Sequence, residues 1–472
     1  MKKLLLLFGL VLLGSPALAM TGFFVGENET PIAVPATKII IASHNGHHTL
    51  TIMPSVASTA RDMAWLFPVP ASVTAQHIRE VSASLFDAID TLSAPRLREE
   101  TDPNPCTTNE LAKTGAEVKS PDIKSYAVTV KHIADETHYD ISFLSAGEGA
   151  KLPEWLEKNG YKLPPKADRI IVPYTQRGNS FLLVKARRNN TDTDYLKPLQ
   201  ITYDAPKLVL PVRLGLINAP SVMVEQPKVK EVTVLNAAPD RNYPKEQTPI
   251  DLFNDGGQAI TLYVITQQGR AASPLMRSVP LGNERMDTNL PSYVSSDFPT
   301  IYNRILNMRV KAESNALITE FAGEVQLPAD VLASIGVNWL NEKPATLPSG
   351  QAYEAADENN LIGGMMLPKA AMPKHLQKAS APEGKPYLTR LYFRYNATTL
   401  PQDIGIAETA SRETLSLRFF THVAAQGDAP GTCDTTAYER SLATRLAHDE
   451  QNLSRLTGWS KNALVEKFNK AK

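Results

Sequence analysis

Three histidines lie close together near the start of the chain, at His44, His47 and His48. Imidazole nitrogens bind Zn²⁺ and Cu²⁺, so the cluster is a candidate metal site. The Asn-Gly pair between the first two is typical of a two-residue hairpin turn joining strands at 37–43 and 48–53. In that hairpin only His44 and His47 share a face, because His48 points to the apolar side. Polar residues flanking a tight turn are the favoured interpretation, and a metal site at His44 and His47 is the alternative.

A second candidate metal site combines methionines with one histidine. Thioether sulfur and imidazole are ligands that suit Cu(I). The residues concerned are Met365, Met366, Met372 and His375. Their spacing is irregular, so methionines that fill gaps or make contacts are the simpler interpretation. No cofactor is expected from the sequence.

Motifs of the common enzyme classes are not found. The sequence contains no G-x-S-x-G, S-x-x-K, H-E-x-x-H, Walker or G-x-G-x-x-G motif. Asp87 and Asp90 offer two carboxylates on one predicted helix, although Asp87 is better explained as part of the capped start of that helix. Four arginines beside apolar strand residues would either converge on an anionic ligand or, as we favour, pair with carboxylates at sheet edges. These are Arg96, Arg213, Arg390 and Arg394.

The first 19 residues have the three parts of a secretory signal peptide. Lys2 and Lys3 precede an apolar run at 4–13, and a small-residue cleavage sequence ends at Ala19. We therefore expect cleavage after Ala19 and a periplasmic or secreted protein. Met20 follows rather than a cysteine, so no lipid anchor is expected, and no later window is long and apolar enough for a transmembrane helix.

The two cysteines, Cys106 and Cys433, each lie in a segment typical of loops. Two cysteines in an exported chain most simply form one disulfide bond. Cysteine catalysis is not favoured, because there is no C-x-x-C motif and no evident histidine partner. We expect a Cys106–Cys433 bridge, with two free thiols as the alternative.

Hydrophobic periodicity predicts an α+β fold with mostly antiparallel sheets, a few short helices and a C-terminal helix. Strands are predicted at 37–43, 48–53, 62–67, 126–133, 139–144, 170–173, 181–186, 199–203, 208–214, 260–266, 316–321, 388–395 and 415–423. Helices are predicted at 74–92, 153–158, 299–310 and from 438 to about 458.

Length and charge limit the class of protein. The 472 residues are too many for one compact unit, and 49 basic against 49 acidic residues argue against a dedicated nucleic-acid binder. Beyond the signal peptide at 1–19, we expect several regions. They are an N-terminal α+β domain at 20–225, a second α+β region at 226–342, a Pro-rich flexible insert at 343–386, and C-terminal strands and helix at 387–472 that pack back on the preceding domains.

Several short motifs follow one another in a recognisable order. They are Phe23-Phe24-Val25, Phe67-Pro68-Val69-Pro70, Ser93-Ala94-Pro95-Arg96-Leu97, Pro105-Cys106, Trp155-Leu156 with Asn159-Gly160-Tyr161, Leu210-Pro211-Val212-Arg213-Leu214-Gly215 and Thr389-Arg390-Leu391. Together they resemble a family of secreted or envelope-associated bacterial proteins known only as a domain of unknown function. The resemblance implies bacterial origin and export, and it supplies no catalytic residues.

These observations favour a non-enzymatic binding or scaffolding protein of the bacterial cell envelope. Its partner would be an unidentified envelope protein or polymer rather than nucleic acid. An envelope-polymer hydrolase with an active site assembled from distant positions is an alternative. Copper handling through the Met/His segment is a second alternative.

Overall fold

The computed structural model describes most of the chain outside its first residues and several connecting segments. The described residues are 22–26, 32–58, 60, 62–106, 138–144, 152–161, 163, 167–187, 195–218, 257–281, 287–313, 315–340, 385–396, 403–425, 434–460, 462–464 and 468. The predicted signal peptide, the predicted strand at 126–133, the Pro-rich insert up to residue 384 and Cys433 lie outside them.

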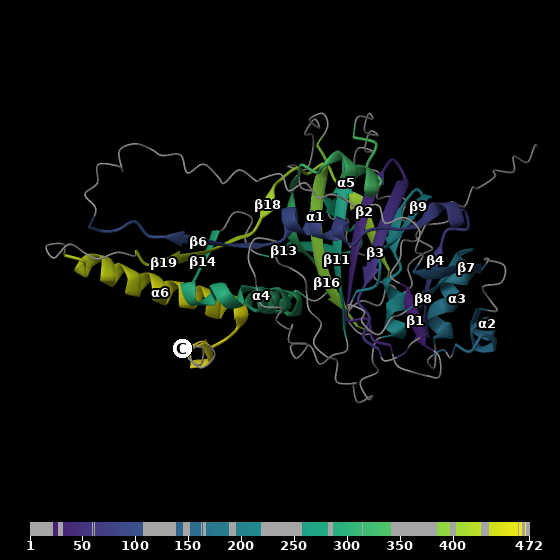
Figure 1. The fold of residues 1–472 in the computed structure, drawn as a ribbon, viewed down its shortest axis with the longest axis horizontal. Helices are drawn as coiled ribbons and strands as arrows, with labels where there is room; N and C mark the ends of the chain where they lie inside the picture. The colour runs from purple at the N-terminus through teal and green to yellow at the C-terminus, as the bar shows by residue number, and fades with distance from the viewer. Residues whose placement is uncertain are drawn as a thin grey trace, which may run out of the picture.

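A large mixed sheet forms the centre of the molecule (Figure 1). Its strand order is β13-β15-β16-β11-β2-β3-β9-β5, and β18 pairs with β15 beside this path. The strands are β2 (Ala36–His44), β3 (His47–Pro54), β5 (Ile78–Glu80), β9 (Leu199–Asp204), β11 (Gln258–Thr266), β13 (Arg277–Pro280), β15 (Ala316–Glu324), β16 (Tyr387–Tyr395) and β18 (Leu415–Ser416). Strands from 20–225, 226–342 and 387–472 therefore share one sheet.

A second, antiparallel sheet packs against one face of the large sheet. It contains β1 (Phe23–Gly26), β4 (Asp62–Val69), β8 (Ser180–Arg187) and β7 (Tyr139–Leu144), in the order β1-β4-β8-β7. Alternating residues of both sheets fill the space between them, with Ile41 and Leu50 from one side and Trp65 and Val184 from the other. A small sheet of β10 (Leu208–Leu210), β17 (Ile404–Glu408) and β12 (Ala271–Ala272) adds to the same core.

Helices cover the outer face of each sheet. On the large sheet lie α1 (Ser84–Ser93) and α5 (Ala329–Ser334), and on the four-stranded sheet lie α2 (Leu152–Lys158), α3 (Asp168–Gln176) and the 3₁₀ helix η4 (Val212–Ile217). The result is a helix–sheet–sheet–helix stack, which we call the body. The fold is α+β, as predicted from the sequence.

A second unit, which we call the arm, extends from one side of the body (Figure 1). It consists of β6 (Arg96–Thr101), β14 (Asp287–Leu290), β19 (Arg418–Val423) and the long helix α6 (Thr436–Thr457). The 3₁₀ helix η6 (Ser292–Asp297) and α4 (Phe298–Ala312) join it to the body through a separate apolar cluster. Among the described residues, no helix combines the length and apolar character needed to cross a membrane.

The hairpin predicted from Asn45-Gly46 is present with the predicted register. His44 pairs with His47 and Ser43 with His48, and both turn residues have positive φ, 49° at Asn45 and 81° at Gly46. These values are those that a two-residue hairpin turn requires. The C-terminal helix also ends as predicted, at Gly458 in the left-handed conformation (φ 70°).

Three other predictions of local structure were wrong. The predicted helix at 74–92 contains a 3₁₀ turn, η1 (Ala75–His77), and the edge strand β5 before α1 begins. The predicted strand at 170–173 lies within helix α3, whose face with Ile171 and Tyr174 packs on the four-stranded sheet despite the β-branched sequence. The predicted strand at 208–214 is divided between β10 and η4. In each case tertiary packing outweighs the local pattern.

Candidate functional site

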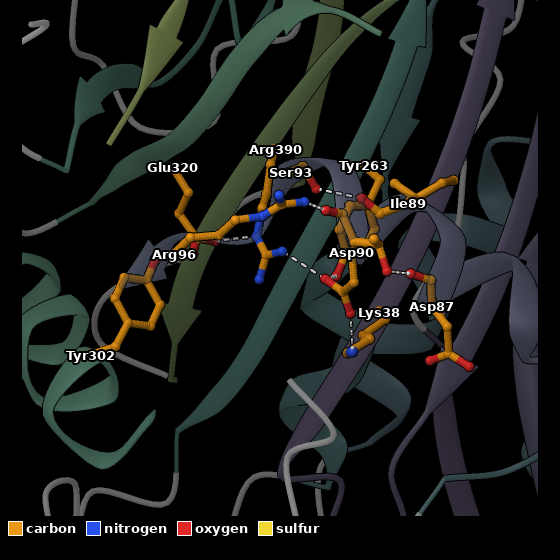
Figure 2. A network of polar contacts seen from close by, with 11 residues as sticks. Lys38, Asp87, Ile89, Asp90, Ser93, Arg96, Tyr263, Tyr302, Glu320 and Arg390 are labelled. Atoms are coloured by element: carbon orange, nitrogen blue, oxygen red, sulfur yellow. Dashed lines mark hydrogen bonds and ion pairs between the residues drawn. The ribbon is translucent and has the colours of Figure 1, made fainter. Parts of the chain in front are cut away.

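A buried network of charged and tyrosine side chains lies where α1, the large sheet and α4 meet (Figure 2). Each member comes from a different element of the fold. They are Lys38 from β2, Asp90 from α1, Tyr263 from β11, Tyr302 from α4, Glu320 from β15 and Arg390 from β16. The chain positions are up to 352 residues apart, between Lys38 and Arg390, so the fold alone brings them together.

Asp90 is the centre of the network because of its position on α1. It lies on the stripe that also carries Phe86, Ile89 and Ser93, the side of the helix that packs on the sheet. Its carboxylate accepts hydrogen bonds from Lys38 Nζ at 2.7 Å, Arg390 Nη1 at 2.6 Å and Tyr263 Oη at 2.5 Å. Both oxygens of this carboxylate, in a mostly apolar stripe, therefore have hydrogen-bond donors.

A β-bulge positions the second carboxylate, Glu320. The register between β15 and β16 shifts between Thr319 and Phe321, so Glu320 is the extra residue of β15. Its side chain is 1% exposed and accepts a hydrogen bond from Arg390 Nε at 3.1 Å. Tyr302 donates a second hydrogen bond to it from α4. The guanidinium of Arg390 is therefore held between two buried carboxylates.

Mutual compensation determines the charge states of the network. Burial alone would raise the pKa of Asp90, but the cations Lys38 and Arg390 outweigh it and the pKa lies below its ordinary value. Burial would lower the pKa of Arg390, whereas Glu320, Tyr263 and Asp90 raise it well above its ordinary range. Burial also raises the pKa of Tyr263, which stays a neutral donor. Two cations thus balance two carboxylates.

Asp87, the other carboxylate of the pair noted in the sequence, does not join Asp90. It lies on the exposed side of α1, while Asp90 points to the sheet. The pKa of Asp87 lies above its ordinary value, mainly because of partial desolvation. Lys38 opposes this shift and Asp90 adds to it. The N-cap residue of α1 is Ala83, which makes no side-chain capping hydrogen bond. The predicted capped start of the helix was therefore wrong.

A second polar site lies at the turn end of the β2–β3 hairpin. His48 Nε2 lies 3.0 Å from the carbonyl oxygen of Ala205, and His48 Nδ1 lies 2.9 Å from Ser43 Oγ. A carbonyl only accepts, so Nε2 carries the proton and the Ser43 hydroxyl donates to Nδ1. Burial is the main cause that lowers the pKa of His48 to about 4, so the ring is neutral at pH 7.

The two histidines proposed as metal ligands have other contacts. His44 stacks on Trp339 with ring centroids 4.8 Å apart, and its Nε2 lies 2.8 Å from the Asn45 amide. His47 Nδ1 lies 2.6 Å from Asp204 at the exposed side of the turn. In the described part of the chain, no group of three or more His, Cys, Asp or Glu is arranged to hold a metal ion.

In the arm, Asp102 joins the strand ends to α6. Arg445 donates two hydrogen bonds to its carboxylate, at 3.0 and 2.6 Å, and Tyr438 donates a third at 2.7 Å. The Arg445 hydrogen bonds are the main reason that the pKa of Asp102 lies below its usual value. Asp102 and Arg445 are 343 positions apart, so no local sequence pattern indicates this site.

The remaining candidate residues have separate outcomes. Arg390 pairs with carboxylates, as favoured from the sequence, but in the buried interior and not at a sheet edge. Arg394 donates to the backbone oxygen of Gly257 at 3.1 Å. The methionine and histidine candidates at 365–375 lie outside the described residues. Cys106 follows β6, while Cys433 is outside the described part, so their bridge stays a prediction.

A protein-family model described as "Uncharacterized protein conserved in bacteria (DUF2330)" matches residues 15–407. The chain belongs to this family. The resemblance proposed from the sequence motifs to a bacterial family of unknown function is thereby confirmed. The matched range of this uncharacterised bacterial family includes most of the body with β6 and β14, and it ends before β19 and α6.

Other comparisons add little to the family assignment. No curated protein matches the chain. Among solved structures, the crystal structure of baculovirus P35 is similar to part of it, at 11% identity and a TM-score of 0.23. That match covers 52% of this chain and 66% of the P35 chain, so the chain spans less than two thirds of its length.

Proposed function

We propose that the protein is an exported, non-catalytic binding or scaffolding protein of the bacterial cell envelope, and that the arm is its binding element. The proposal is carried by the contrast in exposure between the arm and the body. In β6 every residue except Leu97 is exposed, and α6 buries only Asp449, Leu453 and Thr457. A long helix and a strand held away from the main core are suited to contact another molecule.

Photocrosslinking in cells tests the binding element. A photoreactive amino acid at Leu446 on α6, which is 43% exposed, is compared with one at Leu275 on the body, which is 47% exposed. We expect a discrete crosslinked product in the envelope fraction from the arm position. Equal crosslinking from both positions, or none from Leu446, contradicts the proposed role of the arm.

Export is tested separately from binding. Purified protein from the bacterial envelope fraction should begin at Met20, as the signal-peptide prediction requires. Deleting residues 2–19 should leave the protein in the cytoplasm. Protein from the envelope fraction that still begins at residue 1 would contradict cleavage after Ala19.

The predicted Cys106–Cys433 disulfide bond would lie in the arm and is consistent with export, because disulfide bonds persist outside the cytoplasm. Asp102 N–H donates to Val423 O at 2.9 Å, and Tyr438 Oη donates to Asp102 and accepts from the Ala425 N–H, so Asp102, four residues before Cys106, lies beside the described end of the β19 segment at 423–425. Intact-mass analysis before and after reduction should show the gain of two hydrogens. Two thiols that react with an alkylating reagent in folded exported protein would exclude the bridge.

One observation favours the alternative of a hydrolase. Ser43 donates to a neutral histidine whose other nitrogen is oriented by the Ala205 carbonyl, which is the relation of a nucleophile to its base. In acyl transfer the Ser43 oxygen would attack the carbonyl carbon while its proton passes to His48 Nδ1. The imidazolium would give that proton to the leaving group as the bond to it breaks, and water would then hydrolyse the Ser43 ester. A fluorophosphonate probe tests this: labelling must disappear in Ser43→Ala and persist in Ser295→Ala. Unlabelled wild-type protein excludes the alternative.

Copper handling by Met365, Met366, Met372 and His375 stays a prediction. Cu(I) titration of the full chain and of a chain lacking residues 363–375 tests it. Equal affinity of the two proteins would exclude the site.

A further inference from the structure

The strand β6 forms an open edge of the arm. It is the last strand of the three-stranded sheet β14-β19-β6, and no described strand pairs with its other side. Parallel strands are normally covered on both faces, whereas nearly all of β6 is exposed. An uncovered strand edge with free N–H and C=O groups is a template for another strand.

We propose that the β6 strands of two copies of this chain pair antiparallel across a two-fold axis, joining their arm sheets into one continuous sheet. This proposal does not rest on export, on an envelope partner or on any catalytic role. It concerns only the backbone geometry and the charge sequence of β6. Both are specific enough to fix the register of the pair.

The backbone directions of β6 follow from its pairing with β19. Asp102 N–H donates to Val423 O at 2.9 Å, so the backbone groups of Asp102 point toward β19. Because directions alternate along a strand, Arg98 and Glu100 also point toward β19. The groups of Leu97, Glu99 and Thr101 therefore point to the open edge.

Hydrogen bonding selects one register among the symmetric pairings. With Glu99 on the two-fold axis, Leu97 of each copy lies opposite Thr101 of the other, and every outward N–H and C=O of β6 has a partner. Moving the axis to Arg98 or to Glu100 leaves one outward residue of each strand unpaired. The register centred on Glu99 is therefore preferred by the backbone.

Charge selects the same register. It places Arg98 of each copy opposite Glu100 of the other, in the non-hydrogen-bonded pairs where Cα atoms approach to about 4.5 Å. An axis at Arg98 would oppose two arginines, and an axis at Glu100 would oppose two glutamates. Charged residues usually discourage edge pairing, but here the sequence Arg98-Glu99-Glu100 complements itself. The one like-charge contact, Glu99 with Glu99, occupies a hydrogen-bonded pair with about 5.5 Å between Cα atoms.

Charge reversal tests the proposal by analytical ultracentrifugation of the purified full chain over a range of concentrations. Arg98→Glu and Glu100→Arg should each weaken dimerisation by roughly 10- to 100-fold, since each opposes like charges twice. The double variant restores opposite charges and should dimerise like the wild type. An equimolar mixture of the single variants should form heterodimers. Arg440→Glu, an exposed reversal on α6, is the control and should leave the dimer unchanged.

A crosslink tests the register itself. Glu99→Cys should form a reducible covalent dimer under mild oxidation, because hydrogen-bonded cross-strand pairs lie within disulfide reach. Arg98→Cys, offset from its own copy, should crosslink much less, and the unsubstituted protein serves as the background control. A wild-type chain that stays monomeric, a dimer insensitive to both reversals, or a double variant that is not restored would each overturn the proposal. Circular dichroism identifies any variant that fails to fold.

Discussion

Two arginines show how the body and the arm differ. Arg390 in the body is 4% exposed and lies between the carboxylates of Asp90 and Glu320. Arg445 in the arm is 29% exposed and pairs with the single carboxylate of Asp102. Both make good hydrogen bonds and both aspartates are 9% exposed, but only the first arginine is itself shielded from water. An arginine–aspartate ion pair therefore contributes differently to the free energy of unfolding in the two regions.

The surrounding cores reinforce this difference. In the body, the network is buried between the large sheet and the helices α1 and α4, so the loss of one charge cannot be compensated by water. In the arm, α6 buries residues only in its second half, at Asp449, Leu453 and Thr457. We expect local opening to begin in the arm, while the body unfolds as a unit.

The largest effect should follow from Arg390→Met. The change leaves Glu320 buried without a cation and removes one of the two cations beside Asp90. Removal of one partner from a buried ion pair costs about 3–5 kcal/mol. We expect this loss in the free energy of unfolding, measured by urea denaturation at pH 7. A loss below about 1 kcal/mol would show that the buried network does not differ from a surface pair.

A pH-dependent effect of nearly the same size should come from His48. Its folded pKa of about 4 lies below the unfolded value of 6.5, so the unfolded state binds the proton first. The contribution of the neutral His48 to the free energy of unfolding is therefore fully present above pH 6.5. It falls by up to about 3 kcal/mol as the pH drops to 4. Asp90, whose folded pKa is also lowered, loses its contribution only below about pH 4.

Matched variants separate these two groups. The free energy of unfolding is measured by urea denaturation at pH 7 and at pH 4.5. His48→Gln should remove most of the difference in this free energy between the two pH values. His47→Gln, at the exposed neighbouring position, should keep it. If His48→Gln retains the full difference, the desolvated histidine is not its source.

The sequence predicted local structure well where a single element explains the pattern. The hairpin at Asn45-Gly46 and the end of α6 at Gly458 depend on backbone conformations that few residues adopt. It failed for α3, because Ile171 and Val172 favour strands locally and only the sheet beneath selects a helix. The predicted division into domains stays a prediction.

The site was less predictable for a physical reason. The sequence offers Asp90 and Arg390 as separate candidates, yet nothing local indicates that β2, β11, β15, β16 and two helices converge on them. The bulge at Glu320 arises from the pairing of β15 with β16, and a single strand does not show it. The one local signal was a carboxylate in the apolar stripe of a helix, at Asp90.

A smaller effect is expected at the junction of the two regions. Tyr302→Phe removes the donor that α4 supplies to Glu320, a hydrogen bond to a charged group that contributes about 2 kcal/mol. Tyr203→Phe is the control, since the buried Tyr203 hydroxyl has no hydrogen-bond partner among the described residues. Its removal should be neutral or slightly stabilising in thermal unfolding. Equal losses in both variants would mean that burial of the ring, and not the bond to Glu320, is the stabilising factor.

The smallest effect should come from Arg445→Met, the arm counterpart of the change at Arg390. Asp102 is 9% exposed, but removal of the partly exposed Arg445 side chain opens its carboxylate to water and the Tyr438 hydroxyl stays bound, so the cost should be about 1 kcal/mol. Hydrogen exchange should become faster in the first half of α6 and stay unchanged in β2 and β11, because opening of the arm does not expose the body. Since Arg445 holds the pKa of Asp102 down, the difference between variant and wild type should shrink as the pH falls below about 4. If exchange in the body rises together with that in α6, the arm and the body form one cooperative unit, and the contrast between the two arginines reflects solvent exposure alone.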